Sequence, residues 1–348
     1  MYRRAQWLLI INAAAVAVGA IVLSIACGHR LIDPDGSFLG PSWFRLPLLL
    51  GLAIAADLVP RTLWFSRCRP RLMKPIFLER LKSHWTKDRL LLVALGVICF
   101  YLVYVGYRNM KSFLPFVIHT KYDRELELID TALLFGHHPG VVMQHIFGDG
   151  FMAYFFSYVY LWFLPLVPIA VTIWIVWSRK LAYGYWFVCA QCIAWTLGTI
   201  SYYALPTLGP GIAYPYLYSA EPNTPAGQLM NGLTSGRQNV LTGWSDAVQS
   251  VAGFASLHCA ITLLTALMVQ YTIRQKVFRV IFWINFGCTA LATLYFGWHN
   301  ISDDVAGITI ALTSFYLGGL AANQKFERKG RRQLDDPDLA PEQAVELV

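Results

Sequence analysis

The sequence predicts an all-α, polytopic membrane protein with about eight transmembrane helices. Of its 348 residues, 56% are hydrophobic and only 14% are charged, whereas an ordinary soluble domain is about 25% charged. Apolar runs long enough to cross a hydrocarbon layer of about 30 Å recur along the chain. These two observations exclude a soluble globular protein.

The expected spans divide the chain into three parts. Two N-terminal helices and a basic connection occupy residues 1–89, a six-helix core occupies 90–322, and a solvated cytoplasmic tail occupies 323–348. The eight expected spans are 7–27, 44–60, 90–107, 152–177, 182–205, 251–273, 279–298 and 304–322.

The basic residues predict the orientation in the membrane. The formal net charge is +8, but the positive residues gather in connections that fall on one side when the spans alternate. This is the positive-inside bias, so we expect both termini in the cytoplasm and a multi-pass protein of the plasma membrane. The clusters suit anionic lipid headgroups rather than nucleic acid. The densest cluster comprises Arg61, Arg67, Arg69, Arg71, Lys74, Arg80, Lys82, Lys87 and Arg89.

Two long polar segments interrupt the rhythm of spans and short connections. They are 108–150 and 206–250, and the alternation of spans places both outside the cytoplasm. Long connections in a compact protein are usually functional or disordered. We therefore look for a site at the outer ends of the spans.

Three ionisable residues lie at those outer ends. His258 is expected about two turns into the sixth span, and His299 and Asp303 end the seventh at a spacing of i, i+4. If that segment is helical, the carboxylate orients the His299 ring and leaves the other ring nitrogen free as a nucleophile or base. Protonated His258 would donate to a leaving oxygen. The plainer alternatives are a packing histidine at 258 and a helix N-cap at 303.

The motifs around these residues resemble a known family. "FASLHCA" followed about forty residues later by "GWHNISDDVAG" is similar to the second and third signatures of the type 2 phosphatidic acid phosphatase superfamily. "YYALPTLGPG" and "YRNMKSFLP" resemble stretches of its inositol phosphorylceramide synthase-like branch of lipid phosphotransferases. The resemblance covers roughly residues 100–322. It implies that His299 attacks phosphorus, Asp303 orients it, His258 protonates the leaving alkoxide, and Ser256 belongs to the substrate site.

The chain departs from the superfamily pattern in its cationic residues. Ala255 stands where the branch usually has proline, and Thr293 stands where the phosphatases have an arginine six residues before the nucleophile. No intact first motif is present, yet a transferring phosphoryl group needs cationic donors. Arg108 and Lys111 are the first choice for this role, with interfacial snorkelling as the plainer alternative. The other candidates are Lys121, Arg124 and Arg237.

A metal centre is weakly indicated. His137, His138 and His145 lie close together in sequence, but no cysteine or carboxylate stands at a clear ligand spacing. A hydrated loop explains them better. The expected chemistry needs no metal or organic cofactor, because histidine itself carries the phosphoryl group.

These observations favour a membrane-embedded phosphotransferase or phosphatase acting on a phosphorylated lipid from the extracytoplasmic side. Its partners would be that lipid donor, a polyol or lipid alcohol acceptor and the surrounding membrane lipids, with no nucleic acid. Two alternatives remain. One is a transporter with a His/Asp proton relay, and the other is a catalytically inactive homologue that binds lipid phosphate.

Overall fold

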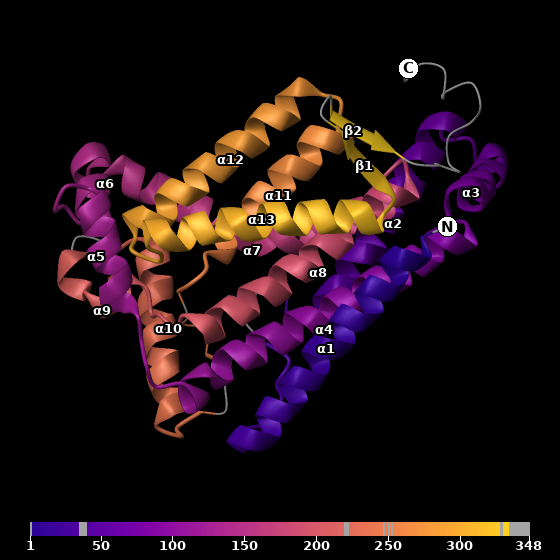
Figure 1. Cartoon of the computed structure of the whole chain (residues 1–348). Coiled ribbons are helices and arrows are strands. Elements are labelled where there is room, and N and C mark those ends of the chain that lie inside the picture. Colours follow the sequence, from indigo (N-terminus) through magenta and orange to yellow (C-terminus); the bar gives the residue numbers. More distant parts are fainter. Residues whose placement is uncertain are drawn as a thin grey trace.

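The computed structural model describes residues 2–34, 40–218, 223–245, 248–249, 251, 253–327 and 330–333. Within these residues almost all regular structure is helical (Figure 1). The prediction of an all-α polytopic membrane protein is confirmed. Eight helices correspond to the eight expected spans: α1 (Arg3–Cys27), α2 (Ser42–Ser66), α4 (Lys87–Val117), α7 (Phe151–Trp177), α8 (Leu181–Ala204), α11 (Leu257–Thr272), α12 (Lys276–Tyr295) and α13 (Ile301–Ala321).

Six of these helices are long and apolar enough to cross a membrane, and α11 is a shorter apolar helix. Helix α8 is not among the six, although it has 24 residues. Its sequence includes Gln191 and several tyrosines and tryptophans, and most of its side chains are buried against other helices. Helix α8 therefore faces protein rather than lipid, which explains its lower hydropathy.

Small residues let the central helices approach each other closely. A Cβ atom added to Gly318 of α13 would lie 2.8 Å from the backbone nitrogen of Ala190 in α8. A Cβ atom at Gly198 would lie 2.6 Å from the side chain of Leu257 in α11. Such contacts are typical of membrane helices, where packing rather than the hydrophobic effect holds neighbours together.

The two ends of the helix bundle carry different elements (Figure 1). One end, here called the α5 end, carries the short helices of the two long polar segments. They are α5 (Asp123–Leu133), α6 (Pro139–Phe147), α9 (Pro210–Ala213), the 3₁₀ helix η1 (Pro215–Leu217) and α10 (Pro225–Leu241). The opposite end, the α3 end, carries the start of α1, the basic helix α3 (Pro70–His84) and a β-hairpin.

A buried ion-pair cluster attaches α3 to the bundle. Asp57 of α2 is 3% exposed and accepts two hydrogen bonds from the Arg80 guanidinium, at 2.8 and 3.1 Å. Arg61 lies 3.2 Å from the same carboxylate. Two arginines thus neutralise this buried carboxylate, which would otherwise be costly within an apolar helix.

Several helix boundaries differ from the sequence expectation. Helix α4 continues ten residues past 107, to Val117, and α11 begins at Leu257 rather than 251 because the Ser256 hydroxyl caps it by accepting the Cys259 N–H. Helix α12 ends at Tyr295, before Gly297, whose φ of 65° is left-handed.

The first part of the expected tail has regular structure, and its solvated, cytoplasmic character stays a prediction. Gln324–Glu327 (β1) and Gly330–Gln333 (β2) pair as an antiparallel hairpin. Residues 334–348 of that expected tail lie outside the described residues. The division into residues 1–89 and a six-helix core stays a prediction, although α1 packs directly on α4 and α8.

The distribution of basic residues generates a testable topology. We expect reporters fused near residue 75 and residue 330 to report the cytoplasm, and those near 130 and 230 to report the outside. An enzyme reporter that is active on only one side of the membrane measures this. An outside signal at residue 75 would overturn the assignment of the α5 end to the outside.

Candidate active site

The contact between α11 and α13 brings the two predicted histidines together. The Ser256 N–H donates to the Asp303 carbonyl at 3.0 Å, and a Cβ atom at Gly307 would lie only 2.3 Å from the Ser256 carbonyl oxygen. Only glycine fits at position 307 without displacing one helix. The start of α11, which carries His258, is therefore held against the start of α13.

His299 precedes α13 instead of lying within the helix as the i, i+4 spacing predicted. Its Nδ1 lies 3.5 Å from Asp303 Oδ2, so the structure still pairs the two side chains. His299 is 6% exposed and Asp303 is fully buried. Asp303 Oδ2 also accepts the Asn300 N–H at 2.9 Å. The N-cap of α13 is Asn300, so Asp303 is not the N-cap of the plainer alternative but the third helical residue of a capping box, and it faces His299 as well.

His258 is the second residue of α11, not two turns into a helix. Its ring centroid is 6.0 Å from that of His299. Tyr160 stacks on it at 4.3 Å, Phe163 lies at 4.1 Å, and Tyr160 also stacks on Trp298 at 4.9 Å. Aromatic rings from α7 therefore fix the orientation of the His258 ring and of the chain just before His299.

Ser256 and Ala255 have structural roles at the start of α11. Ser256 is fully buried and its hydroxyl caps the helix, so its expected role in substrate binding stays a prediction. The Ala255 N–H donates to the Ser201 hydroxyl at 2.9 Å. Proline, the residue that the sequence resemblance suggests for this position, could not make that bond.

Elements of the α5 end surround the segment 297–302, which we call the His299 segment. Gly211 N–H donates to the Gly297 carbonyl at 2.7 Å, and the Tyr218 ring occupies the space next to Gly297 that a Cβ atom would need. A Cβ atom at Gly209 would lie 2.5 Å from the Trp298 carbonyl oxygen. This part of the segment 206–250 thus forms a wall of the site rather than a loose connection.

Helix α5 contributes two buried carboxylates to this wall. Asp130 Oδ2 accepts the Ile301 N–H at 2.6 Å, and Asp123 Oδ1 accepts the N–H groups of Leu208 and Gly209 at 2.8 and 3.0 Å. Sequence reasoning missed both residues. The available signal was their i, i+7 spacing, which places the two carboxylates on one face of a helix.

The predicted cationic residues separate in the structure. Lys111 is 8% exposed, and its ammonium group lies 4.8 Å from the centroid of the Tyr202 ring. It is also close enough to His258 for the two groups to interact electrostatically. Arg108 lies about one turn before Lys111 in α4 and instead donates to the Tyr104 hydroxyl at 3.4 Å. Lys111 is therefore the residue of the pair that the structure brings to the histidines.

The other three cations come from the α5 end. Arg237 of α10 is half-buried, and burial lowers its pKa while the nearby Asp123 opposes that shift. Asp123 is thus a charged neighbour of Arg237, and it also accepts the N–H groups of Leu208 and Gly209 beside the His299 segment. Lys121 and Arg124 are exposed.

Thr293 takes part in a polar network beneath His299. Its hydroxyl donates to Asp304 Oδ2 at 2.9 Å, and the Cys259 thiol lies 3.0 Å from Asp304 Oδ1. Asp304 is 5% exposed. The position where the phosphatases have arginine therefore contributes a neutral donor to a buried carboxylate.

A metal centre finds no support in the described part of the chain, where no group of three or more His, Cys, Asp and Glu side chains is placed to hold an ion. His138 Nδ1 pairs with the Glu127 carboxylate of α5. His137 and His145 are exposed.

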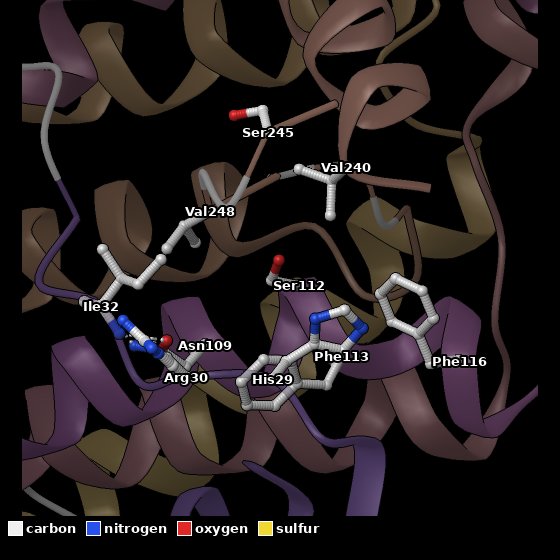
Figure 2. A pocket seen from close by; sticks show the side chains of 10 residues that line it. All are labelled: His29, Arg30, Ile32, Asn109, Ser112, Phe113, Phe116, Val240, Ser245 and Val248. Carbon is white, nitrogen blue, oxygen red and sulfur yellow. Dashed lines mark hydrogen bonds between the residues drawn. The ribbon is translucent and has the colours of Figure 1, made fainter. Parts of the chain in front are cut away.

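A small cavity lies between α4, the chain after α1 and the end of α10 with the residues that follow it (Figure 2). Its volume of about 20 Å³ holds about one water molecule, too little for a lipid headgroup. Asn109 closes one side by accepting the Ile32 N–H at 2.9 Å and donating to the Ile32 carbonyl at 2.8 Å. His29 packs on Phe116 at 4.3 Å. This cavity marks where the chain after α1 binds α4, not a substrate site.

Comparison with known proteins identifies the family. A family model described as the PAP2 superfamily matches residues 124–317, which is more than half of the chain. The chain belongs to the PAP2 superfamily. No curated protein and no solved structure matched it. Membership supports phosphatase- or phosphotransferase-type chemistry on phosphorylated lipids. The match includes α5 to α13 but not Arg108 and Lys111, which precede it.

The buried carboxylate of Asp130 generates a prediction about stability and pH. Burial raises its pKa from 3.8 to about 6, against the opposing effect of its hydrogen bonds. Because this pKa is higher in the folded state, Asp130 contributes to the free energy of unfolding below pH 3.8, and this contribution is lost as the pH rises through about 6. Asparagine does not titrate. We therefore expect the Tm of Asp130→Asn, relative to the Tm of the wild type, to rise as the pH is raised from about 4 to about 7.

Thermal unfolding of both proteins in the same detergent, at several pH values, measures this difference. The negative charge of Asp303 also raises the pKa of Asp130, but Asp303 is present in both proteins, so the comparison isolates the effect of position 130. A Tm difference that does not change with pH would contradict the prediction.

Proposed function

We propose that this protein is a membrane-embedded phosphotransferase or phosphatase that acts on a phosphorylated lipid through a phosphohistidine at His299. One observation carries the proposal. His299 Nδ1 faces the buried Asp303 carboxylate at 3.5 Å, which leaves Nε2 as the nucleophile, and the His258 ring lies 6.0 Å away.

The proposed reaction has two steps. In the first, His299 Nε2 forms a bond to phosphorus, the bond from phosphorus to the leaving oxygen breaks, and His258 gives that oxygen a proton. In the second, His258 takes a proton from water or an alcohol, whose oxygen attacks the phosphohistidine and releases His299. Asp303 holds the ring orientation and stabilises the positive charge on the imidazole.

Lys111 is the proposed cation for the phosphoryl oxygens. It is buried, and its ammonium group lies 4.8 Å from the centroid of the Tyr202 ring and 3.5 Å from the Tyr107 hydroxyl. Arg237 of α10 is the second proposed contact, because it is half-buried and has the carboxylate of Asp123 as a charged neighbour. The mechanism itself requires no metal or organic cofactor, because histidine is the covalent carrier.

The proposed location of the reaction is the extracytoplasmic side of the plasma membrane. The site lies at the α5 end of the bundle, whereas the strongly basic helix α3 lies at the opposite end. The positive-inside bias places the α3 end in the cytoplasm.

A second candidate function is binding of a lipid phosphate without turnover. The observation that favours it is Thr293, a neutral residue at the position of the phosphatases' arginine. Measurement of activity in purified protein separates the two candidates.

Variants of the three central residues test the mechanism. We expect His299→Ala to abolish turnover, and Asp303→Asn to lower kcat severely, by about 10⁴-fold if the comparison with a serine protease triad holds. His258→Ala should lose the least activity with donors whose leaving group needs no proton.

Release of phosphate from radiolabelled phospholipids and polyprenyl phosphates measures turnover. His137→Ala is the matched control, since this histidine is exposed on the same end of the bundle. Full activity in His299→Ala would exclude the covalent mechanism.

We further propose transfer to an alcohol rather than hydrolysis, as in the inositol phosphorylceramide synthase-like branch that the motifs resemble. The fate of a phosphohistidine depends on which hydroxyl reaches it, and the His299 and Asp303 side chains are nearly inaccessible to water. Added polyols or lipid alcohols should therefore accelerate consumption of the donor and appear in a new phosphodiester. Product analysis by mass spectrometry tests this. Inorganic phosphate as the sole product across a broad acceptor panel would identify a lipid phosphatase instead.

A further inference from the structure

Asp130 of α5 contacts the first residues of α13 from a distant part of the chain. Its side chain is fully buried. Oδ2 accepts the Ile301 N–H at 2.6 Å, and Oδ1 lies 3.4 Å from the Ser302 nitrogen and 3.2 Å from the Ser302 hydroxyl. The first N–H groups of a helix have no partner within the helix, and its N-terminus attracts negative charge. Asp130 supplies both the acceptors and the charge.

The two residues that Asp130 holds lie between the members of the His–Asp pair. Ile301 and Ser302 connect His299 to Asp303, and the whole pair spans five residues. A shift of this short backbone would change the 3.5 Å separation between His299 Nδ1 and Asp303 Oδ2. The contact of Asp130 with the backbone thus bears directly on the geometry of the pair.

A second carboxylate on the same face of α5 supports the same segment independently. Asp123 accepts the N–H groups of Leu208 and Gly209, and Gly209 packs against the Trp298 carbonyl with no room for a Cβ atom. Helix α5 therefore reaches the His299 segment on both sides of His299.

We propose that Asp130 is a positioning residue that sets the geometry of the His299–Asp303 pair. The inference rests on the proposed function, since it assigns a role in that reaction. Asp130 touches no reacting atom and acts only through the backbone of Ile301 and Ser302.

Stability alone does not explain a carboxylate at this position. Burial raises the pKa of Asp130, so the ionised group costs folding stability at neutral pH. A neutral acceptor would hold one backbone N–H without that cost. What the carboxylate adds is two acceptor oxygens, which hold two successive residues at once.

The test compares Asp130→Asn and Asp130→Ala with the wild type and with a matched control. Glu127→Gln is the control, because Glu127 is a buried carboxylate of the same helix that pairs with His138 rather than with α13. Since a misplacement of about 1 Å can cost about 100-fold in rate, we expect kcat to fall about 10- to 100-fold in Asp130→Asn. The loss should be larger in Asp130→Ala, which keeps no acceptor, and KM should change by less than about threefold.

The rate constant for phosphoenzyme formation in a single turnover is measured together with its amplitude. A purely structural role would lower the amplitude, which counts folded sites, and leave the rate constant unchanged. A wild-type rate constant in Asp130→Asn would overturn the proposal, as would an equal loss in Glu127→Gln.

Hydrogen exchange over residues 297–307, measured by mass spectrometry, keeps the inference separate from the proposed function. We expect faster exchange of this peptide in Asp130→Asn than in Glu127→Gln. If the wild type shows no His299-dependent turnover, the proposed function fails and the positioning role in that reaction fails with it. If turnover depends on His299 but exchange and the rate constant are unchanged in Asp130→Asn, only the positioning role fails.

Discussion

The close contact between α11 and α13 is the constraint on which the site depends. It requires glycine at 307, where the Ser256 carbonyl occupies the space of a Cβ atom, and it includes a hydrogen bond from Ser256 to the Asp303 carbonyl. Because His258 follows Ser256 and Asp303 faces His299, one backbone contact places all three side chains. Any larger residue at 307 would separate the histidines before it affected either one directly.

The sequence predicted the number and approximate position of the long helices, because apolar length is a strong signal. It placed their ends less well. The starts of α11 and α13 depend on local caps by Ser256 and Asn300, and the end of α12 on Gly297. The spacing of His299 and Asp303 suggested one helical face, but His299 precedes the helix. Their proximity arises because Asp303 bonds back to Asn300 across the helix start.

The surroundings of the site could not be predicted from the sequence, because they depend on contacts between distant segments. Asp130 and Ile301 are 171 positions apart, and nothing in the local pattern of either residue indicates the other. Arg108 and Lys111 were equivalent in sequence, since both lie near the end of one span. The structure distinguishes them through the tyrosines around each, Tyr104 for Arg108 and Tyr202 for Lys111.

The network under His299 explains how the site differs from a phosphatase with arginine at position 293. Here the Asp304 carboxylate receives the Thr293 hydroxyl and the Cys259 thiol, both neutral donors, so no cation approaches from α12 through this position. Under the proposed mechanism the phosphoryl charge must be balanced from elsewhere, by Lys111 of α4 and Arg237 of α10. Both lie outside the α11–α13 contact that places the histidines. Under this proposal the nucleophile and the phosphate-binding residues are positioned by separate parts of the fold, so a change in α10 would alter which substrate is held while the His299–Asp303 pair stays intact.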